Sequence, residues 1–196
     1  MALDQLGEFK AALADLDNQV ILDRFYYSRQ ALMLDGDAEA QLRRSVAKNF
    51  GVAMRDVIVT GSAKLGFTIV AKEKRPIFSP FADESDIDIA IISADLFTSL
   101  WKDAAAFVVE HGQGSWPDAN SFRKYLLRGW LRPDRLPKTA EFPRSKAWFD
   151  FFRLLTASGE YGPYKITGGV YYDEQFWETY AASSFDSCRL AIETPI

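Results

Sequence analysis

Apolar residues in the first fifty positions recur every three or four residues, which is the period of a helix with one buried face. The first such set runs over residues 3–20 and predicts one helix. An Asp-Gly-Asp sequence at 35–37 interrupts the pattern, and Asp37 is placed to cap a second helix. That helix should end at Phe50, because Gly51 fits the left-handed position that commonly follows a helix.

Two short runs rich in β-branched residues predict β-strands. Residues 56–60 read Asp-Val-Ile-Val-Thr and end at Gly61, whereas residues 86–93 read Asp-Ile-Asp-Ile-Ala-Ile-Ile-Ser. Between these runs, the sequence predicts the start of a helix over 62–67. It also predicts a loop over 72–83, because that segment holds two prolines.

The second half of the chain alternates predicted helices with breaks at glycine and proline. Helical periodicity extends over 96–108 and stops at Gly112. Further along, the patterns predict helices at 120–130, 145–157 and 173–192, an extended connection at 132–143, and a strand at 164–172 that Gly168 and Gly169 weaken.

Together these elements predict an α+β fold in which a small mixed β-sheet is flanked by helices. The sequence contains no internal repeat and no glycine–serine linker, so residues 1–196 are expected to form a single domain. Its core should span about 38–112, and the part from about 115 to 196 should be mainly helical.

The composition is that of an ordinary globular protein, with 48% hydrophobic and 26% charged residues. No run approaches the ~20 apolar residues that a membrane span requires, and residues 1–10 lack the apolar segment of a signal peptide. The chain has one cysteine, Cys188, so an intrachain disulfide is impossible and a cytoplasmic location is expected. Since there is also only one histidine, the usual zinc sites are excluded, and any bound metal should be held by oxygen.

The net charge of −4 does not indicate a general nucleic-acid-binding protein, but the charge is unevenly distributed. Residues 121–146 carry eight Lys or Arg and two Asp or Glu, which leaves a local excess of six positive charges. Such a stretch can contact triphosphates or a nucleic-acid backbone. It can also be the solvated face of a helix, and the sequence leaves both interpretations open.

The residues with the clearest chemical meaning are two aspartates on the second predicted strand. Residues i and i+2 of a strand point to the same face, so Asp86 and Asp88 should project together while Ile87 and Ile89 face the core. Two carboxylates held so close repel each other unless a cation lies between them. Mg²⁺ suits this pair, and Mn²⁺ can replace it, because such ions take oxygen ligands and often combine one or two carboxylates with substrate phosphates.

Gly61 and Ser62, at the end of the first strand, complement the two carboxylates. A glycine lets the backbone approach a phosphate closely, and amides at the start of a following helix point at the anion. The Ser62 hydroxyl can add another donor. A Gly-Ser turn and a solvated Asp-x-Asp are each common when taken alone. In this order and strand context, they indicate metal-assisted nucleotidyl transfer.

In these residues the sequence resembles the DNA polymerase β-type nucleotidyltransferase superfamily, whose pattern is Gly-Ser, then a helix, then a strand carrying Asp-x-Asp. The resemblance covers roughly residues 42–100 and places Gly61, Ser62, Asp86 and Asp88 on that pattern. The segments GSAKLGF, SDIDIAIIS and LFTSLW are most similar to small bacterial anti-phage nucleotidyltransferases related to the cyclic-oligonucleotide synthases, among them the Hailong-type enzymes. The resemblance implies a polymerase β-like core.

The resemblance also implies a function: a Mg²⁺- or Mn²⁺-dependent enzyme that transfers NMP or dNMP from a nucleoside triphosphate to a hydroxyl and releases pyrophosphate. Its product would be an oligonucleotide signal in anti-phage defence. Asp86 and Asp88 would hold the metal. Nucleotide binding would involve Gly61, Ser62, Lys64 and Ser85. The candidates for steadying the leaving group are Lys64, Lys72, Lys74 and Arg75, although lysines on a loop are usually only solvated.

The chain departs from the family pattern in two ways. The spacing from Gly-Ser to Asp-x-Asp is longer than usual, because of the loop at 72–76. The family normally has a third catalytic carboxylate on a later strand, and no apolar-Asp-apolar strand is evident here. Asp173, which follows the strand predicted at 164–172, is the best candidate, since Asp150 falls in a predicted helix. The alternative role for Asp173 is that of a helix cap.

Two functions are therefore compatible with the sequence. The first is the nucleotidyltransferase, with a nucleoside triphosphate as substrate and with a nucleic-acid primer or product, or a protein effector, as further partners. The alternative is a catalytically degenerate nucleotidyltransferase fold that binds nucleotide or a protein partner, as an antitoxin module would. The lack of an evident third carboxylate keeps this alternative open.

Overall fold

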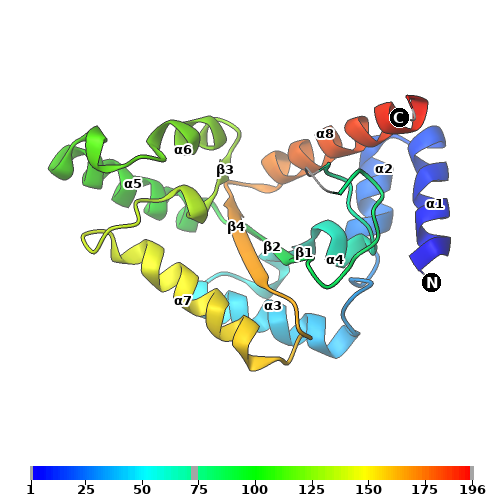
Figure 1. Ribbon diagram of the computed structural model, residues 1–196, viewed down its shortest axis with the longest axis horizontal. Coiled ribbons are helices and arrows are strands. Elements are labelled where there is room, and N and C mark those ends of the chain that lie inside the picture. The colour runs from blue at the N-terminus through cyan, green and yellow to red at the C-terminus, as the bar shows by residue number, and fades with distance from the viewer. Residues whose placement is uncertain (1, 72–74, 195–196) are drawn as a thin grey trace.

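The computed structural model describes residues 2–71 and 75–194. In these ranges, eight α-helices surround one four-stranded mixed sheet, whose strand order is β1-β2-β4-β3 (Figure 1). The predicted α+β fold with a small mixed sheet is thereby confirmed. No helix in these ranges combines the length and apolarity that crossing a membrane requires.

The sheet joins both halves of the chain. β1 (Val57–Thr60) runs antiparallel to β2 (Ile87–Ile92), and β2 runs parallel to β4 (Ile166–Tyr171). β4 in turn pairs antiparallel with the short β3 (Trp130–Leu131). Two of the four strands therefore come from the part of the chain that was expected to be mainly helical.

Most helices lie where the sequence patterns place them. Gly51 has φ +68° and follows the helix ending at Phe50, as predicted. The helices are Ala2–Asp15 (α1), Asn18–Leu22 (α2), Gly36–Phe50 (α3), Gly61–Leu65 (α4), Ala94–His111 (α5), Ala119–Leu126 (α6), Pro143–Ser158 (α7) and Glu174–Glu193 (α8).

Two predictions for the N-terminal region were wrong. The single helix expected over 3–20 is divided into α1 and α2, and α3 is capped by a different aspartate from the one expected. Asp17 has an extended backbone and its side chain accepts a hydrogen bond from the Val20 N–H (2.9 Å), so it ends that helix early and caps α2. Likewise Asp35, not Asp37, caps α3, because its side chain accepts from the Ala38 N–H (2.7 Å). Asp37 lies inside the first turn, where a negative charge is favourable.

The helix predicted over 120–130 is also shorter than expected. It ends at Leu126, and Gly129 adopts φ +60°, a left-handed conformation that an L-residue reaches only with strain. The Gly129 C=O accepts a hydrogen bond from the Tyr172 N–H (2.9 Å). The chain therefore turns at Gly129, and Trp130 begins a strand beside β4.

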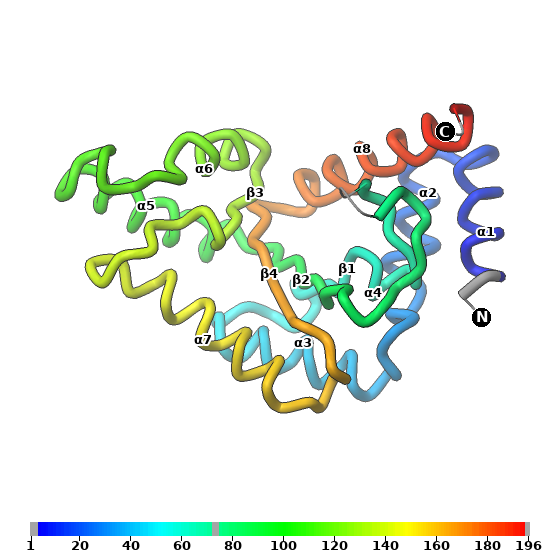
Figure 2. The backbone as a smooth tube through the Cα atoms, viewed as in Figure 1, coloured from blue at the N-terminus to red at the C-terminus, as the bar shows by residue number. Residues whose placement is uncertain are grey.

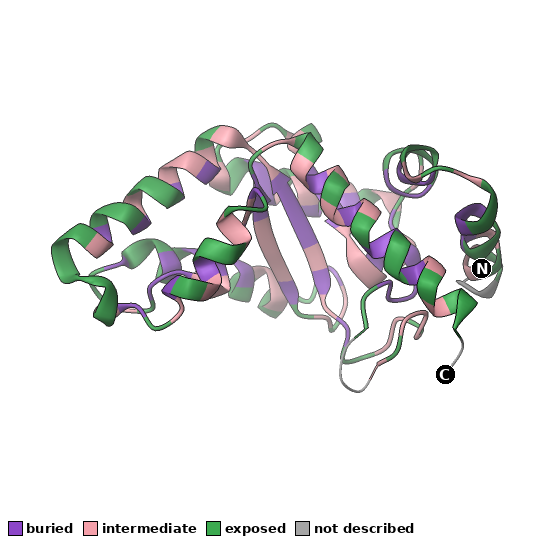
Figure 3. Ribbon diagram, turned by 90° about the horizontal axis from the view of Figure 1, so that it is seen from above, coloured by how far each residue is buried: buried purple, intermediate pink, exposed green. Residues whose placement is uncertain are grey.

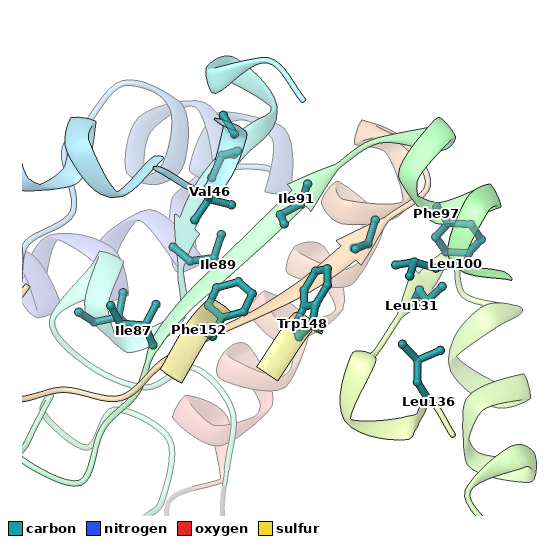
Figure 4. Packing of buried hydrophobic residues seen from close by; sticks show 14 of the residues in the cluster. Val46, Ile87, Ile89, Ile91, Phe97, Leu100, Leu131, Leu136, Trp148 and Phe152 are labelled. Carbon is teal, nitrogen blue, oxygen red and sulfur yellow. The ribbon is translucent and has the colours of Figure 1, made fainter. Parts of the chain in front are cut away.

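A hydrophobic core covers each face of the sheet. Because side chains alternate along a strand, Ile87 and Ile91 point to one core, where Phe152 of α7 packs near them (Figure 4). Ala90 points to the other core, which contains Trp177 of α8. The strands are largely buried, whereas the outer faces of the helices are exposed (Figure 3). The two aspartates of the sequence motif share the face of Ala90.

The first and last helices lie beside each other at one end of the molecule (Figure 2). The guanidinium of Arg189 on α8 donates to the backbone C=O of Leu13 (2.9 Å) and of Leu16 (3.1 Å). The rings of Phe9 on α1 and Phe185 on α8 are 5.8 Å apart. The N-terminal helices are thus held by the C-terminal helix.

A substitution at Gly168 tests the packing of α7 against β4. A Cβ at residue 168 would lie 2.5 Å from Cζ of Phe152, which is buried. We expect Gly168→Ala to lower the free energy of unfolding by about 1–3 kcal/mol in urea denaturation, because overpacking forces the ring or the strand to shift. Gly7→Ala is the control: Gly7 is exposed in α1 with nothing within 4 Å of a Cβ, so this change should stabilise by about 0.5–1 kcal/mol. Stabilisation in both variants would contradict the packing.

Candidate active site

The four residues of the sequence motif line one cavity of about 760 Å³. The cavity lies where β1 leads into α4 and where β2 begins, and its other walls come from β4, α7 and α8. Gly61 and Ser62 contribute the start of α4, and Asp86 and Asp88 contribute the start of β2. The fold therefore brings together the two parts of the motif that are separated by a long loop in the sequence.

The side chain of Asp88 lies against the backbone of Gly61. Thr60 is the register partner of Asp88 on β1, so the next residue, Gly61, lies beside the aspartate. Gly61 has φ +64°, and a Cβ on it would be 2.9 Å from Oδ2 of Asp88. Two constraints therefore require a glycine at residue 61. The backbone is left-handed, and the Asp88 carboxylate occupies the space that a Cβ would need.

A threonine that the sequence analysis did not single out contacts Asp88 from the other neighbouring strand. Thr167 on β4 is the register partner of Asp88, and its hydroxyl donates a hydrogen bond to Oδ1 of Asp88 (2.8 Å). Thr167 lies 79 residues from Asp88 in the chain, so no local pattern could indicate the contact.

Asp86 lies just before β2, on the same face as Asp88, and is half-buried. Its carboxylate makes no hydrogen bond or ion pair with the described residues, which leaves both oxygens available to a ligand. Two carboxylates lining one cavity fit a divalent cation such as Mg²⁺ or Mn²⁺, which takes oxygen ligands and can complete its coordination with phosphate and water. Within the described ranges, no three His, Cys, Asp or Glu residues converge to hold a metal.

Ser62 is half-buried, and its hydroxyl has no hydrogen-bond partner among residues 2–71 and 75–194. Thr60, at the N-terminus of α4, makes no side-chain capping bond to the helix. The Ser62 hydroxyl is therefore available to a ligand in the cavity, and its role in nucleotide binding stays a prediction.

Lys64 lies apart from this cavity, although it is only two residues from Ser62. It is buried, its ammonium donates to the backbone C=O of Arg29 (2.5 Å), and it forms an ion pair with Glu39 (3.8 Å). Burial lowers the pKa of the Lys64 ammonium, and the charge of Glu39 acts in the opposite direction. These contacts tie α4 to α3 and to the segment before it, and Lys64 does not line the cavity that holds the two aspartates.

Ser85 and Arg75 act together in the loop before β2. Ser85 is buried, and its hydroxyl oxygen accepts hydrogen bonds from Arg75 (2.7 Å) and from the Ala82 N–H (3.0 Å). Arg75 also donates to the backbone C=O of Pro80 (2.6 Å). These contacts order the loop. The other predicted loop cations, Lys72 and Lys74, lie outside the described residues.

Asp173 is not brought to the other two aspartates. β2 and β4 run parallel, and Asp88 pairs with Thr167 near one end while Ile92 pairs with Tyr171 at the other. Asp173 follows that far end, where its side chain accepts from the Phe176 N–H (3.1 Å) and caps α8. The capping role that the sequence left open for Asp173 is the one the structure shows.

An aromatic wall extends the cavity beyond the carboxylates. Tyr171 on β4 and Tyr180 on α8 line the cavity. Burial raises the pKa of both hydroxyls, the charge of Asp88 raises it further, and the charge of Arg132 acts against this. Both tyrosines therefore stay neutral at physiological pH. The Arg132 guanidinium stacks on the Trp130 ring (5.2 Å) at the edge of this wall.

Ion pairs neutralise most of the basic stretch at 121–146. Several of the carboxylates in these pairs come from outside the stretch, so a count of charges within residues 121–146 does not include them. In the described ranges, three of the eight cations, all exposed, have no carboxylate partner: Arg123, Lys124 and Arg128. The ion pairs are Arg132–Asp134, Arg135–Asp134, Arg135–Asp118, Lys138–Asp118, Arg144–Asp103 and Lys146–Asp150.

No family model, curated protein or solved structure matched the chain. The likeness to nucleotidyltransferases therefore depends on the sequence motif alone.

The buried position of Lys64 predicts a structural role. Lys64→Met would leave the Glu39 carboxylate buried without its cation, so we expect the free energy of unfolding to fall by about 3–5 kcal/mol. Chemical denaturation measures this loss. The double variant Lys64→Met/Glu39→Gln should recover most of it. If Lys64 bound nucleotide instead, Lys64→Met would keep its stability and lose nucleotide affinity.

The exposed cation Arg128 tests the basic stretch as a nucleic-acid contact. Arg128→Gln should reduce the slope of log affinity against log salt by about 0.7 for a single-stranded oligonucleotide, because one phosphate contact is lost. Arg144→Gln is the matched control and should change the slope less, since Arg144 is already bound to Asp103 (2.6 Å). Fluorescence anisotropy over a KCl series gives both slopes. An affinity that does not depend on salt would show that the stretch is only solvated surface.

Proposed function

We propose that this protein is a divalent-metal-dependent nucleotidyltransferase that transfers a nucleoside monophosphate from a nucleoside triphosphate to an acceptor hydroxyl. The observation that carries the proposal is the position of the Asp88 carboxylate, with Oδ2 2.9 Å from where a Cβ of residue 61 would be. A metal-binding carboxylate and the Gly61-Ser62 turn are thus within reach of the same triphosphate. Asp86, on the same face, supplies the second carboxylate.

In this reaction the oxygen of the acceptor hydroxyl forms a bond to the α-phosphorus, and the bond from that phosphorus to the α–β bridging oxygen breaks. Pyrophosphate leaves, and the hydroxyl proton passes to water. Asp86 and Asp88 would hold the divalent ion, which when bound supplies Lewis-acid stabilisation of charge on the phosphates. Gly61 would let the triphosphate approach the backbone, and the Ser62 hydroxyl would donate to a phosphate oxygen.

Several finer features of the proposal are supported by the sequence resemblance alone. These are a polymerase β-like core, an oligonucleotide signal as the product, and a role in anti-phage defence. The acceptor hydroxyl would belong to a nucleotide or nucleic-acid primer, or to a protein. A cytoplasmic location is proposed from the single cysteine, Cys188, which is buried and unpaired.

One observation favours a second candidate, a degenerate fold that binds nucleotide or a protein without turnover. In the described part of the chain, the two aspartates are not joined by a third carboxylate, and the neighbour of Asp88 on β4 is the neutral Thr167. Such a module would bind a nucleoside triphosphate through the same Gly61-Ser62 turn and release no pyrophosphate.

The two candidates differ in pyrophosphate release. The assay incubates purified protein and Mg²⁺ or Mn²⁺ with each labelled nucleoside or deoxynucleoside triphosphate in turn. A nucleotidyltransferase should release pyrophosphate and transfer the label to an acceptor. We expect Asp88→Asn to reduce this rate by at least about 100-fold, because a neutral amide holds a divalent ion less well than a carboxylate does, and that ion would stabilise the charge on the phosphates.

Asp173→Asn is the matched control, since it removes an aspartate that only caps α8. It should leave the rate within about twofold and change the stability little, because Asn caps a helix about as well as Asp. Turnover by Asp88→Asn equal to that of the wild type would refute the site. Nucleotide binding without turnover in the wild type would favour the binding module.

A further inference from the structure

The contact between Thr167 and Asp88 has a defined direction. An ionised carboxylate can only accept a hydrogen bond, so the proton in the 2.8 Å contact belongs to the threonine hydroxyl. Thr167 is β-branched and lies within β4, which restricts its χ1 angle. The backbone pairing of β2 with β4 therefore fixes where the hydroxyl points, and the hydroxyl fixes Oδ1 of Asp88.

The second oxygen of Asp88 is constrained from the opposite side. Oδ2 lies against the backbone of Gly61, the residue that follows the β1 partner of Asp88. Rotation of the carboxylate about its Cβ–Cγ bond would break the bond to Thr167 and would turn an oxygen away from Gly61. The carboxylate is thus held in one orientation between two neighbouring strands. Asp86, in contrast, has no such bond among the described residues.

The chemistry of the donor also matters. A lysine or arginine in place of Thr167 would orient Asp88 equally well, but its charge would repel an incoming cation. The Thr167 hydroxyl supplies the hydrogen bond without adding a positive charge to the site. Outer partners of this kind commonly orient metal ligands, and their loss weakens metal binding about 10–100-fold.

We propose that Thr167 is a positioning residue that holds the Asp88 carboxylate ready for a divalent cation. This inference rests on the proposed function, in which Asp86 and Asp88 bind the metal. It assigns part of the site to the C-terminal half of the chain, outside the segment that carries the sequence motif.

The test is Mn²⁺ binding to the full chain, measured from the electron paramagnetic resonance signal of free Mn²⁺. Thr167→Val removes the hydroxyl and keeps the branched shape, so we expect the dissociation constant to rise about tenfold. Thr167→Ser restores a hydroxyl and should stay within about threefold of the wild type. Thr167→Ala provides a second variant without the hydroxyl, should the valine variant fold poorly, and the same loss is expected for it.

Thr156→Val is the matched control. Thr156 lines the same cavity, and its hydroxyl contacts the same strand by accepting from the Ile166 N–H (2.9 Å), but that hydroxyl donates to the backbone C=O of Phe152 (2.9 Å) and not to Asp88. This variant should lower the melting temperature and leave the Mn²⁺ affinity unchanged.

The outcomes separate this inference from the proposed function. Wild-type affinity in Thr167→Val and Thr167→Ala would overturn the role of Thr167 while leaving the metal site intact. Equal weakening in Thr156→Val and Thr167→Val would also overturn it, since the effect would then be general loss of structure. If the wild type bound no Mn²⁺, either alone or with a nucleoside triphosphate, the proposed function and this inference would both fail.

Discussion

The register of β2 against its two neighbours is the constraint on which the rest of the structure depends. It places Asp88 between Thr60 and Thr167, and it directs Ile87 and Ile91 into a core. A slip of one residue would exchange the two faces, so that the isoleucines entered the cavity and the carboxylate entered the core. Burying an unpaired carboxylate is far more costly than burying an alkyl side chain. Burial of the isoleucines on one face of β2 therefore determines that Asp88 lies on the other face, in the cavity.

The features that the sequence predicts correctly are those with a local cause. Alternation of two residues is sufficient to place Asp86 and Asp88 on one face, and a β-branched run ending at Gly61 is sufficient to mark a strand and its turn. The β4 strand forms despite its two glycines, because they are places where Phe152 and the Trp130 ring approach the backbone closely. Local patterns of this kind identify the α+β class, but they do not give the order of the strands in the sheet.

The features that the sequence does not predict depend on distant contacts. Lys64 has the appearance of a phosphate ligand beside Ser62, and only the position of Glu39 shows that it is part of a buried pair. The positive charge of residues 121–146 is likewise reduced by carboxylates outside that stretch, such as Asp118 and Asp103. Thr167 could not be recognised because its role is defined by a strand partner 79 residues away. Spacing within one segment carries no information about such neighbours.

The central position of β4 has a consequence for how the chain acquires its structure. During synthesis, β1 and β2 emerge first, and one edge of the isoleucine-rich β2 stays unpaired until residues 166–171 are available to it. An unpaired hydrophobic edge is a template for pairing with other chains, and closing such a distant contact is slow. The nascent chain is therefore most prone to aggregation just before β4 inserts. Pairing of this strand with β2 completes the sheet and also brings the Thr167 hydroxyl to the Asp88 carboxylate.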